Sequence, residues 1–144
     1  MTKKTYSPIE PCSLPVSNGM KLALDRLLKS KPDTSDQTIT LNFRDSSYSA
    51  ESGGYHPVEI RLTKTGTGNW CIQYITDFAY MGRAYPELER SVDFDIANGA
   101  CFFAGVGWQP INTLGVSGFY KMWESNFLSY LDSDAYDDIT TTQS

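Results

Sequence analysis

Two stretches of alternating apolar and polar residues, at 38–44 and 58–63, constrain the fold of this chain most. Their apolar positions are Ile39, Leu41 and Phe43 in the first and Val58, Ile60 and Leu62 in the second. An alternation of period two is typical of a strand with one buried face. Turn residues at 66–69 lead into a third apolar run at 70–78, so we expect an antiparallel meander.

Two amphipathic helices are predicted, one before and one after the strands. The first ends before Pro32 and has apolar residues at helical spacing at Met20, Ala23, Leu24, Leu27 and Leu28. The second spans about 113–131 and has a strongly aromatic face, formed by Val116, Phe119, Tyr120, Trp123, Phe127, Tyr130 and Leu131. We expect this aromatic stripe to pack against the core.

The region between the third strand and the second helix has mixed signals. Residues 86–90 predict a short helix with Pro86 in its first turn. Residues 92–96 alternate again, and Asn98-Gly99 predicts a hairpin into a strand at 100–103. The order of elements predicts an α+β fold: an antiparallel sheet of about four to six strands with an N-terminal and a C-terminal amphipathic helix packed on it.

A single domain is expected for a chain of 144 residues. Residues 1–15 contain three prolines without periodicity and predict a flexible N-terminal arm, which Ile9 or Leu14 could pin to the domain. Residues 16–139 form the predicted domain. Residues 140–144 are predicted to be a frayed tail, although the segment around Tyr136 and Ile139 could add a short edge strand.

The net charge of -5 argues against nucleic-acid binding by direct basic contact and against an anionic membrane surface as a partner. The charge is uneven, because residues 91–144 carry one lysine and seven acids. This acidic part is either a solvated surface, a docking face for a basic partner or a mimic of nucleic-acid charge.

The three cysteines, Cys12, Cys71 and Cys101, form no metal-binding or redox motif. This usage fits a reducing compartment, and no signal peptide or membrane-spanning run is visible, so we expect a cytoplasmic protein without a cofactor.

The loop at 45–56 holds the residues most suited to chemistry. His56 is the only histidine, and Asp45 and Glu51 are acids near it in sequence, so the three are the catalytic candidates for a small hydrolase. The structural alternative is a histidine that ties its loop together by hydrogen bonds. Gly53-Gly54 predicts a tight turn rather than a phosphate loop.

Binding and metal candidates lie in and around the same loop. Arg44, Tyr48, Tyr55 and Arg61 are the binding candidates. Asp93 and Asp95 share a strand face and are the candidate ligands for magnesium or calcium. Asp77, which ends the third apolar run, is interpreted as a turn or cap residue.

Several motifs of the chain resemble the signature of an uncharacterised bacterial family, the domain of unknown function 2787, found mostly in marine gammaproteobacteria such as vibrios. They are Leu-Asn-Phe-Arg-Asp at 41–45, Tyr-Ser-Ala-Glu at 48–51, Gly-Gly-Tyr-His-Pro-Val-Glu-Ile at 53–60, Tyr-Ile-Thr-Asp-Phe at 74–78, Asp-Phe-Asp at 93–95 and Trp-Glu-Ser-Asn-Phe-Leu-Ser-Tyr at 123–130. The likeness runs from about residue 14 to the acidic tail. It implies a small cytoplasmic bacterial protein, encoded by an accessory gene of mobile elements, and it brings no catalytic residues with it.

The sequence contains no complete catalytic constellation. We therefore predict a protein of unknown function that acts as a non-enzymatic protein-binding or accessory module, with an unknown protein partner. The alternative is a small hydrolase or carboxylate-metal enzyme centred on the 45–56 loop.

Overall fold

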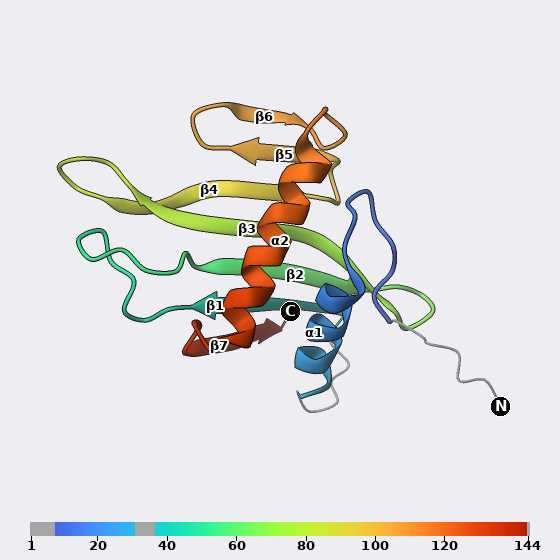
Figure 1. The fold of residues 1–144 in the computed structure, drawn as a ribbon. Helices are drawn as coiled ribbons and strands as arrows, with labels where there is room; N and C mark the ends of the chain where they lie inside the picture. Colours follow the sequence, from blue (N-terminus) through green and yellow to red (C-terminus); the bar gives the residue numbers. More distant parts are fainter. Residues whose placement is uncertain (1–7, 31–36, 144) are drawn as a thin grey trace.

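The computed structural model describes residues 8–30 and 37–143. These residues form two helices and one seven-stranded antiparallel sheet (Figure 1). The elements are α1 (Asn18–Lys29), β1 (Thr38–Arg44), β2 (Val58–Lys64), β3 (Trp70–Met81), β4 (Glu87–Asp95), β5 (Ala100–Phe103), β6 (Gly107–Pro110), α2 (Val116–Asp132) and β7 (Asp138–Gln143). The α+β class is confirmed, but the predicted range of four to six strands is too small.

The sheet is a meander from β1 to β6, and β7 returns to extend it beside β1. The spatial order is β6-β5-β4-β3-β2-β1-β7. Helix α2 is therefore not the last element, because β7 follows it and pairs with β1 from Ile39 to Arg44. Residues 140–143, which the sequence assigns to a frayed tail, lie within this strand.

Strand β4 replaces the short helix predicted at 86–90. Glu87 pairs with Met81 and the ladder continues to Ile75 and Phe94, so β3 and β4 form a long hairpin. A shift in register follows Asp77, which therefore lies inside β3 rather than at its end. The hairpin predicted at Asn98-Gly99 is confirmed, since Asp95 pairs with Ala100 and Gly99 has a φ of 65°.

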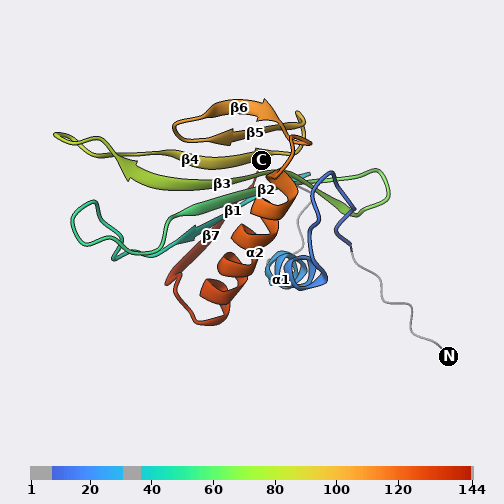
Figure 2. The same cartoon turned by 45° about the horizontal axis from the view of Figure 1, so that its top comes forward.

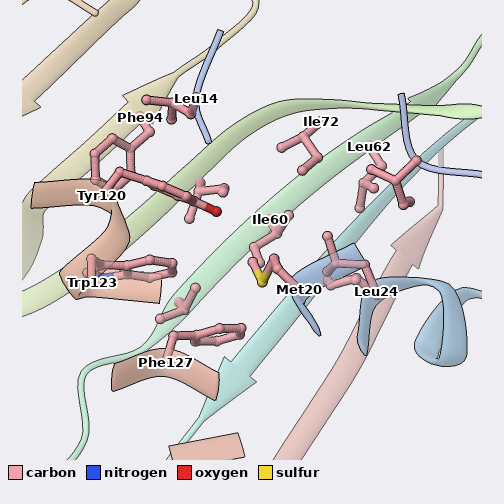
Figure 3. Packing of buried hydrophobic residues seen from close by; sticks show 14 of the residues in the cluster. Leu14, Met20, Leu24, Ile60, Leu62, Ile72, Phe94, Tyr120, Trp123 and Phe127 are labelled. Atoms are coloured by element: carbon pink, nitrogen blue, oxygen red, sulfur yellow. The ribbon is translucent and has the colours of Figure 1, made fainter. Parts of the chain in front are cut away.

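Both helices cover the same face of the sheet, which leaves the opposite face without a helical layer (Figure 2). Burial follows the alternation of the strands, so that every second residue of β1 is buried. Side chains of α1 and α2 pack against the apolar side chains of the strands beneath them (Figure 3). The largest fully buried side chains of this core are Tyr120, Phe43, Phe94 and Phe127.

A buried carboxylate joins the two helices. Oε2 of Glu124 in α2 accepts hydrogen bonds from the Ser17 backbone N–H, at 3.1 Å, and from the Tyr120 hydroxyl, at 2.7 Å. Ser17 also caps α1, because its side chain accepts from the Met20 N–H. The bond therefore fixes the first turn of α1 against α2.

The described part of the predicted N-terminal arm is attached to the sheet. The Trp70 N–H donates to the Pro8 carbonyl at 2.6 Å, and the Glu10 N–H donates to the Trp70 carbonyl at 2.8 Å. Ile9 and Leu14, the two residues that could pin the arm to the domain, are both buried. Residues 1–7 of the predicted arm lie outside the described residues.

Candidate functional site

The β1–β2 loop, residues 45–57, is organised around Asp45. Its Oδ1 accepts from the N–H and the hydroxyl of Ser47, at 3.0 and 2.6 Å, and its Oδ2 accepts from the Tyr55 N–H at 3.1 Å. These hydrogen bonds, that of the Ser47 hydroxyl first, lower the pKa of the Asp45 carboxyl. Asp45 therefore stabilises the loop, and it does so through Ser47 and Tyr55.

Gly54 permits the close turn in this loop. Its φ of 136° lies in a region that side-chain-bearing residues rarely adopt, and a Cβ there would lie 2.8 Å from Asp45 Oδ2. The loop is also fixed to the chain before β7, because the Ser46 N–H and hydroxyl donate to the Asp137 carboxylate. Tyr55 and His56 are thus presented by an ordered loop.

His56 pairs with Asp77 of β3 rather than with the acids of its own loop. The Nδ1–H of His56 donates to Asp77 Oδ1 at 2.7 Å, and Asp77 Oδ2 accepts from Trp123 Nε1–H at 3.0 Å. The hydrogen bond to Asp77 raises the pKa of His56 above its ordinary value of 6.5. This chain of hydrogen bonds joins the loop, the sheet and α2, and we call it the His56–Asp77–Trp123 chain.

Two pairs of tyrosine rings lie near His56, and one ring contacts it directly. Tyr48 meets the imidazole edge to face, with ring centroids 5.5 Å apart, and stacks on Tyr80 at 5.1 Å. The Tyr48 hydroxyl accepts from the Tyr80 N–H at 3.1 Å, which anchors this ring to β3. Tyr55 contacts Tyr130 of α2, with centroids 4.8 Å apart. Both rings of this second pair are partly exposed.

A cleft of about 280 Å³ lies where these elements meet, and we call it the His56 cleft. Its other lining residues are Gly54, Asn126, Phe127 and Tyr136. Tyr136 is largely buried, and burial raises the pKa of its hydroxyl, which keeps that group neutral. The cleft is therefore aromatic, with one fixed polar pair and the Asn126 side chain from α2.

The remaining candidates from the loop lie elsewhere. Glu51 is exposed at the turn of the loop. Arg44 is exposed at the end of β1, where it pairs in register with Asp138 of β7. Arg61 is exposed in β2, opposite Tyr74 of β3. His56 contacts Tyr48 and lines a cleft with Tyr55, whereas Glu51, Arg44 and Arg61 do not line that cleft. Arg44 instead lines a neighbouring pocket with Tyr48 and Tyr80.

Asp77 and Trp123 are site residues that the sequence pattern does not indicate. Asp77 was interpreted as a turn or cap residue, but it holds both His56 and Trp123. The available signal is a single acid in the run at 74–78, whose other residues are two aromatics, an isoleucine and a threonine. Trp123 was assigned to the core, where most of it lies.

The two proposed metal ligands are engaged in other interactions. Asp93 forms an ion pair with Arg90, with Nε and Oδ2 3.1 Å apart. Asp95 accepts from both the N–H and the side-chain amide of Asn98, in the β4–β5 turn. In the part of the chain that the structure describes, no group of three or more His, Cys, Asp or Glu side chains is placed to hold a metal ion.

The fold and the His56 cleft define a small α+β protein in which one face of a sheet carries two helices and an aromatic cleft. The chain belongs to the family described as protein of unknown function (DUF2787), whose model matches residues 19–142. No curated protein matches the chain.

Two solved structures from Vibrio cholerae share the fold. The hypothetical protein VC0508 from the VSP-II pathogenicity island is 47% identical, with a TM-score of 0.85 over 93% of this chain and 98% of that one. The conserved hypothetical protein VC1805 from pathogenicity island VPI-2 is also 47% identical, with a TM-score of 0.84 over 93% of this chain and 99% of that one. VC1805 is described as sharing structural homology with the human P32 protein. The family and these two relatives indicate no specific function.

Neither helix within residues 8–30 and 37–143 has the length and apolar character needed to cross a membrane.

Proposed function

We propose that this protein is a non-enzymatic module that binds a protein partner through the His56 cleft. The observation that carries the proposal is an accessible aromatic cleft whose polar pair is already fixed. Tyr55 and Tyr130 are 40% and 36% exposed, although they contact each other. Rigid, partly exposed tyrosines are enriched in protein interfaces because they supply contact area at a low cost in entropy.

The charge around the cleft favours a basic partner segment. Asp132 and Asp134 are exposed and lie in sequence between Tyr130 and Tyr136, which both line the cleft, so we expect these acids at its rim. Carboxylates at the rim of an interface attract complementary charge and speed association. The proposed partner therefore presents a basic segment, and its binding weakens as salt is raised.

The chemistry of the cleft argues against hydrolysis by covalent catalysis. A histidine–aspartate pair in such an enzyme activates a nucleophile within hydrogen-bond reach. Among the described residues that line the cleft there is no Ser, Thr, Cys or Lys. Asp45 and Glu51, the acids of the hydrolase alternative, are a loop anchor and an exposed turn residue.

The proposed compartment is the cytoplasm. The thiols of Cys12, Cys71 and Cys101 are free, which is the usual state in a reducing compartment. Burial raises the pKa of the Cys101 thiol to about 11, so this group stays protonated and unreactive.

Site-specific photo-crosslinking in the native host tests the proposal. Benzoylphenylalanine at position 55 is expected to give one discrete protein adduct, which His56→Ala or Tyr130→Ala removes. The same probe at Leu22, which is 60% exposed on α1, is the control position and is expected to give no such adduct. Absence of an adduct at position 55, or the same adduct from both positions, would contradict the proposal.

A second measurement addresses the hydrolase alternative. The purified protein is expected to cleave p-nitrophenyl acetate no faster than an equal concentration of free imidazole. Turnover well above that level, and lost in His56→Ala, would replace the binding proposal with a hydrolase that uses His56 as its base.

A further inference from the structure

One face of the sheet carries neither of the two described helices (Figure 2). Side chains of that face line a hollow of about 310 Å³. Thr76 of β3 forms its floor, because it pairs in register with Glu59 of β2 on one side and with Asp93 of β4 on the other. Tyr74, Phe78 and Trp108 also line it. We call this site the open-face hollow. Neighbouring strands lie about 4.8 Å apart, so two carboxylates flank a small central residue.

Asp93 is short of hydrogen-bond donors. Its side chain is only 8% exposed, and its Oδ2 is held by Arg90. Within residues 8–30 and 37–143, its Oδ1 is a buried atom without a hydrogen-bond partner. Buried acceptors are almost always paired, so an unpaired one that lines a hollow calls for an explanation. Burial raises the pKa of the Asp93 carboxyl, whereas the Thr76 hydroxyl and the charge of Arg90 oppose this rise, and the nearby charges of Asp95 and Glu59 add to it.

Glu59 has acceptor capacity beside the same floor. Its Oε2 accepts from the Tyr74 hydroxyl, and burial, together with Glu59, raises the pKa of Tyr74 to about 12. The tyrosine therefore stays a donor to one carboxylate oxygen. A carboxylate accepts several hydrogen bonds, which leaves Glu59 able to take another donor.

The charges in the hollow favour a cation. Glu59, Asp93 and Asp95 supply three carboxylates against the single guanidinium of Arg90. Arg90 is itself held over the rings of Trp108 and Phe102, 5.2 and 5.9 Å from their centroids. An anion would meet excess negative charge, and a neutral ligand would leave that charge uncompensated. A quaternary ammonium has no N–H to give to Asp93.

We propose that the open-face hollow binds a primary alkylammonium group. The ammonium donates to Asp93 Oδ1 and to Glu59 above Thr76, and its methylene chain lies against Phe78 and Trp108. Charge-assisted hydrogen bonds and contact with aromatic walls are the interactions that such a group makes in proteins. The ammonium belongs either to a small amine or to a lysine side chain of another protein.

Calorimetric titration of the full chain with n-butylammonium chloride tests the proposal. Saturable binding is expected for n-butylammonium. Weaker binding is expected for n-butyltrimethylammonium, which has the charge without a donor, and for n-butanol, which has a donor without the charge. Equal binding of n-butanol and n-butylammonium would overturn the proposal, as would the absence of saturable amine binding.

Single substitutions locate the site. Glu59→Gln and Asp93→Asn are each expected to weaken n-butylammonium binding about tenfold, as the loss of one charge-assisted hydrogen bond predicts. Glu51→Gln removes the same charge at an exposed turn and serves as the matched control. Glu59→Gln tests the proposal even if Asp93→Asn impairs folding. Unchanged affinity in Glu59→Gln, or an equal loss in Glu51→Gln, would overturn the assignment.

The source of the ammonium is distinguished by comparing cadaverine with Nα-acetyl-lysine N-methylamide. Tighter binding of the capped lysine supports recognition of a protein side chain, and tighter binding of cadaverine supports a free amine. Failure of both to compete with n-butylammonium would contradict the site.

Discussion

Asp77 and Asp93 are carboxylates on adjacent strands, and they differ in how many of their oxygens have a hydrogen-bond partner. Asp77 faces the helices and has both oxygens bonded, one to His56 and one to Trp123. Asp93 faces the other side, beside Thr76, and has one oxygen bonded to Arg90 and one without a partner in the described chain. The protein itself supplies hydrogen-bond partners for both oxygens of Asp77, whereas Oδ1 of Asp93 gains a partner only from a ligand.

This difference separates two kinds of site in one sheet. In the His56 cleft the polar groups satisfy one another, so binding there depends on shape, aromatic surface and the acidic rim. In the open-face hollow the buried acceptor Asp93 Oδ1 has no hydrogen-bond partner in the described chain, so binding there depends on a hydrogen-bond donor of the ligand. A satisfied buried carboxylate rigidifies a structure, whereas an unsatisfied one destabilises it.

The largest expected effect comes from Phe94, which precedes Asp95 and follows Asp93 but points toward the helices. Its ring contacts Tyr120 and Trp123, with centroids 5.2 and 5.9 Å apart, and it is fully buried. Phe94→Ala is expected to lower the free energy of unfolding by about 3–5 kcal/mol, because it leaves a cavity in the core.

Phe102→Ala is the matched control in urea denaturation. Phe102 pairs with Asp93 in register, but it is only half-buried and contacts Trp108 near the open-face hollow. We expect a loss of about 1 kcal/mol for this variant, since less apolar area is involved. Equal losses in the two variants would contradict the asymmetry of the two faces.

The two carboxylates themselves give the next largest effect. Asp77→Ala is expected to cost about 1–3 kcal/mol in the free energy of unfolding, because His56 and Trp123 each lose a partner. Asp93→Asn is expected to change stability by less than about 1 kcal/mol, since it removes a buried charge whose hydrogen bonds are incomplete. Chemical denaturation of both variants makes the comparison, and a greater loss in Asp93→Asn would reverse it.

A smaller effect is expected from the loop that presents Tyr55 and His56. Gly54→Ala introduces a Cβ against Asp45 Oδ2 at a φ that favours glycine, and it is expected to cost about 1–2 kcal/mol. Gly66→Ala in the β2–β3 turn, where a Cβ meets nothing within 4 Å, is the control. Crosslinking from position 55 should weaken in Gly54→Ala alone, and unaffected crosslinking would show that the loop geometry is irrelevant to binding.

The smallest expected effect is the pH dependence of the His56–Asp77 pair. The pKa of His56 is expected to lie above 6.5, because the hydrogen bond to Asp77 favours the charged imidazole. The stability that this pair contributes is therefore fully present below pH 6.5 and is lost as the pH rises through the folded-state pKa. An NMR titration of the imidazole gives the value, and Asp77→Asn is expected to lower it. An unchanged pKa in Asp77→Asn would contradict the pairing.

The elements that could be predicted from sequence are those with a strong local pattern. Alternation predicted β1 and β2, helical periodicity predicted α1 and α2, and Asn98-Gly99 predicted the β4–β5 hairpin. Strand β7 was missed as a full strand because its acidic, threonine-rich segment has no apolar face of its own, and pairing with β1 forms it. The segment at 86–90 is extended for the same kind of reason, since residues 87–90 pair with β3 across a hairpin.

Some residues of the candidate site could be predicted from the sequence, but the partner of His56 could not. His56, Tyr48 and Tyr55 stand out in the sequence, and they do lie together. Sequence proximity favours Asp45 and Glu51 as partners of His56, and neither is its partner in the structure. Asp77 lies 21 residues away and reaches His56 only because β2 and β3 pair, with Val58 opposite Asp77. Such a contact follows from the register of the sheet.

The indole N–H signals of the three tryptophans offer the most direct test of the difference between the two faces. Trp108 reports on the open-face hollow, Trp123 on the His56 cleft through its bond to Asp77, and Trp70 is a buried reference. Titration with n-butylammonium chloride, followed by NMR, is expected to shift the Trp108 signal saturably and to leave those of Trp123 and Trp70 in place. A saturable shift at Trp123 with none at Trp108 would contradict the account.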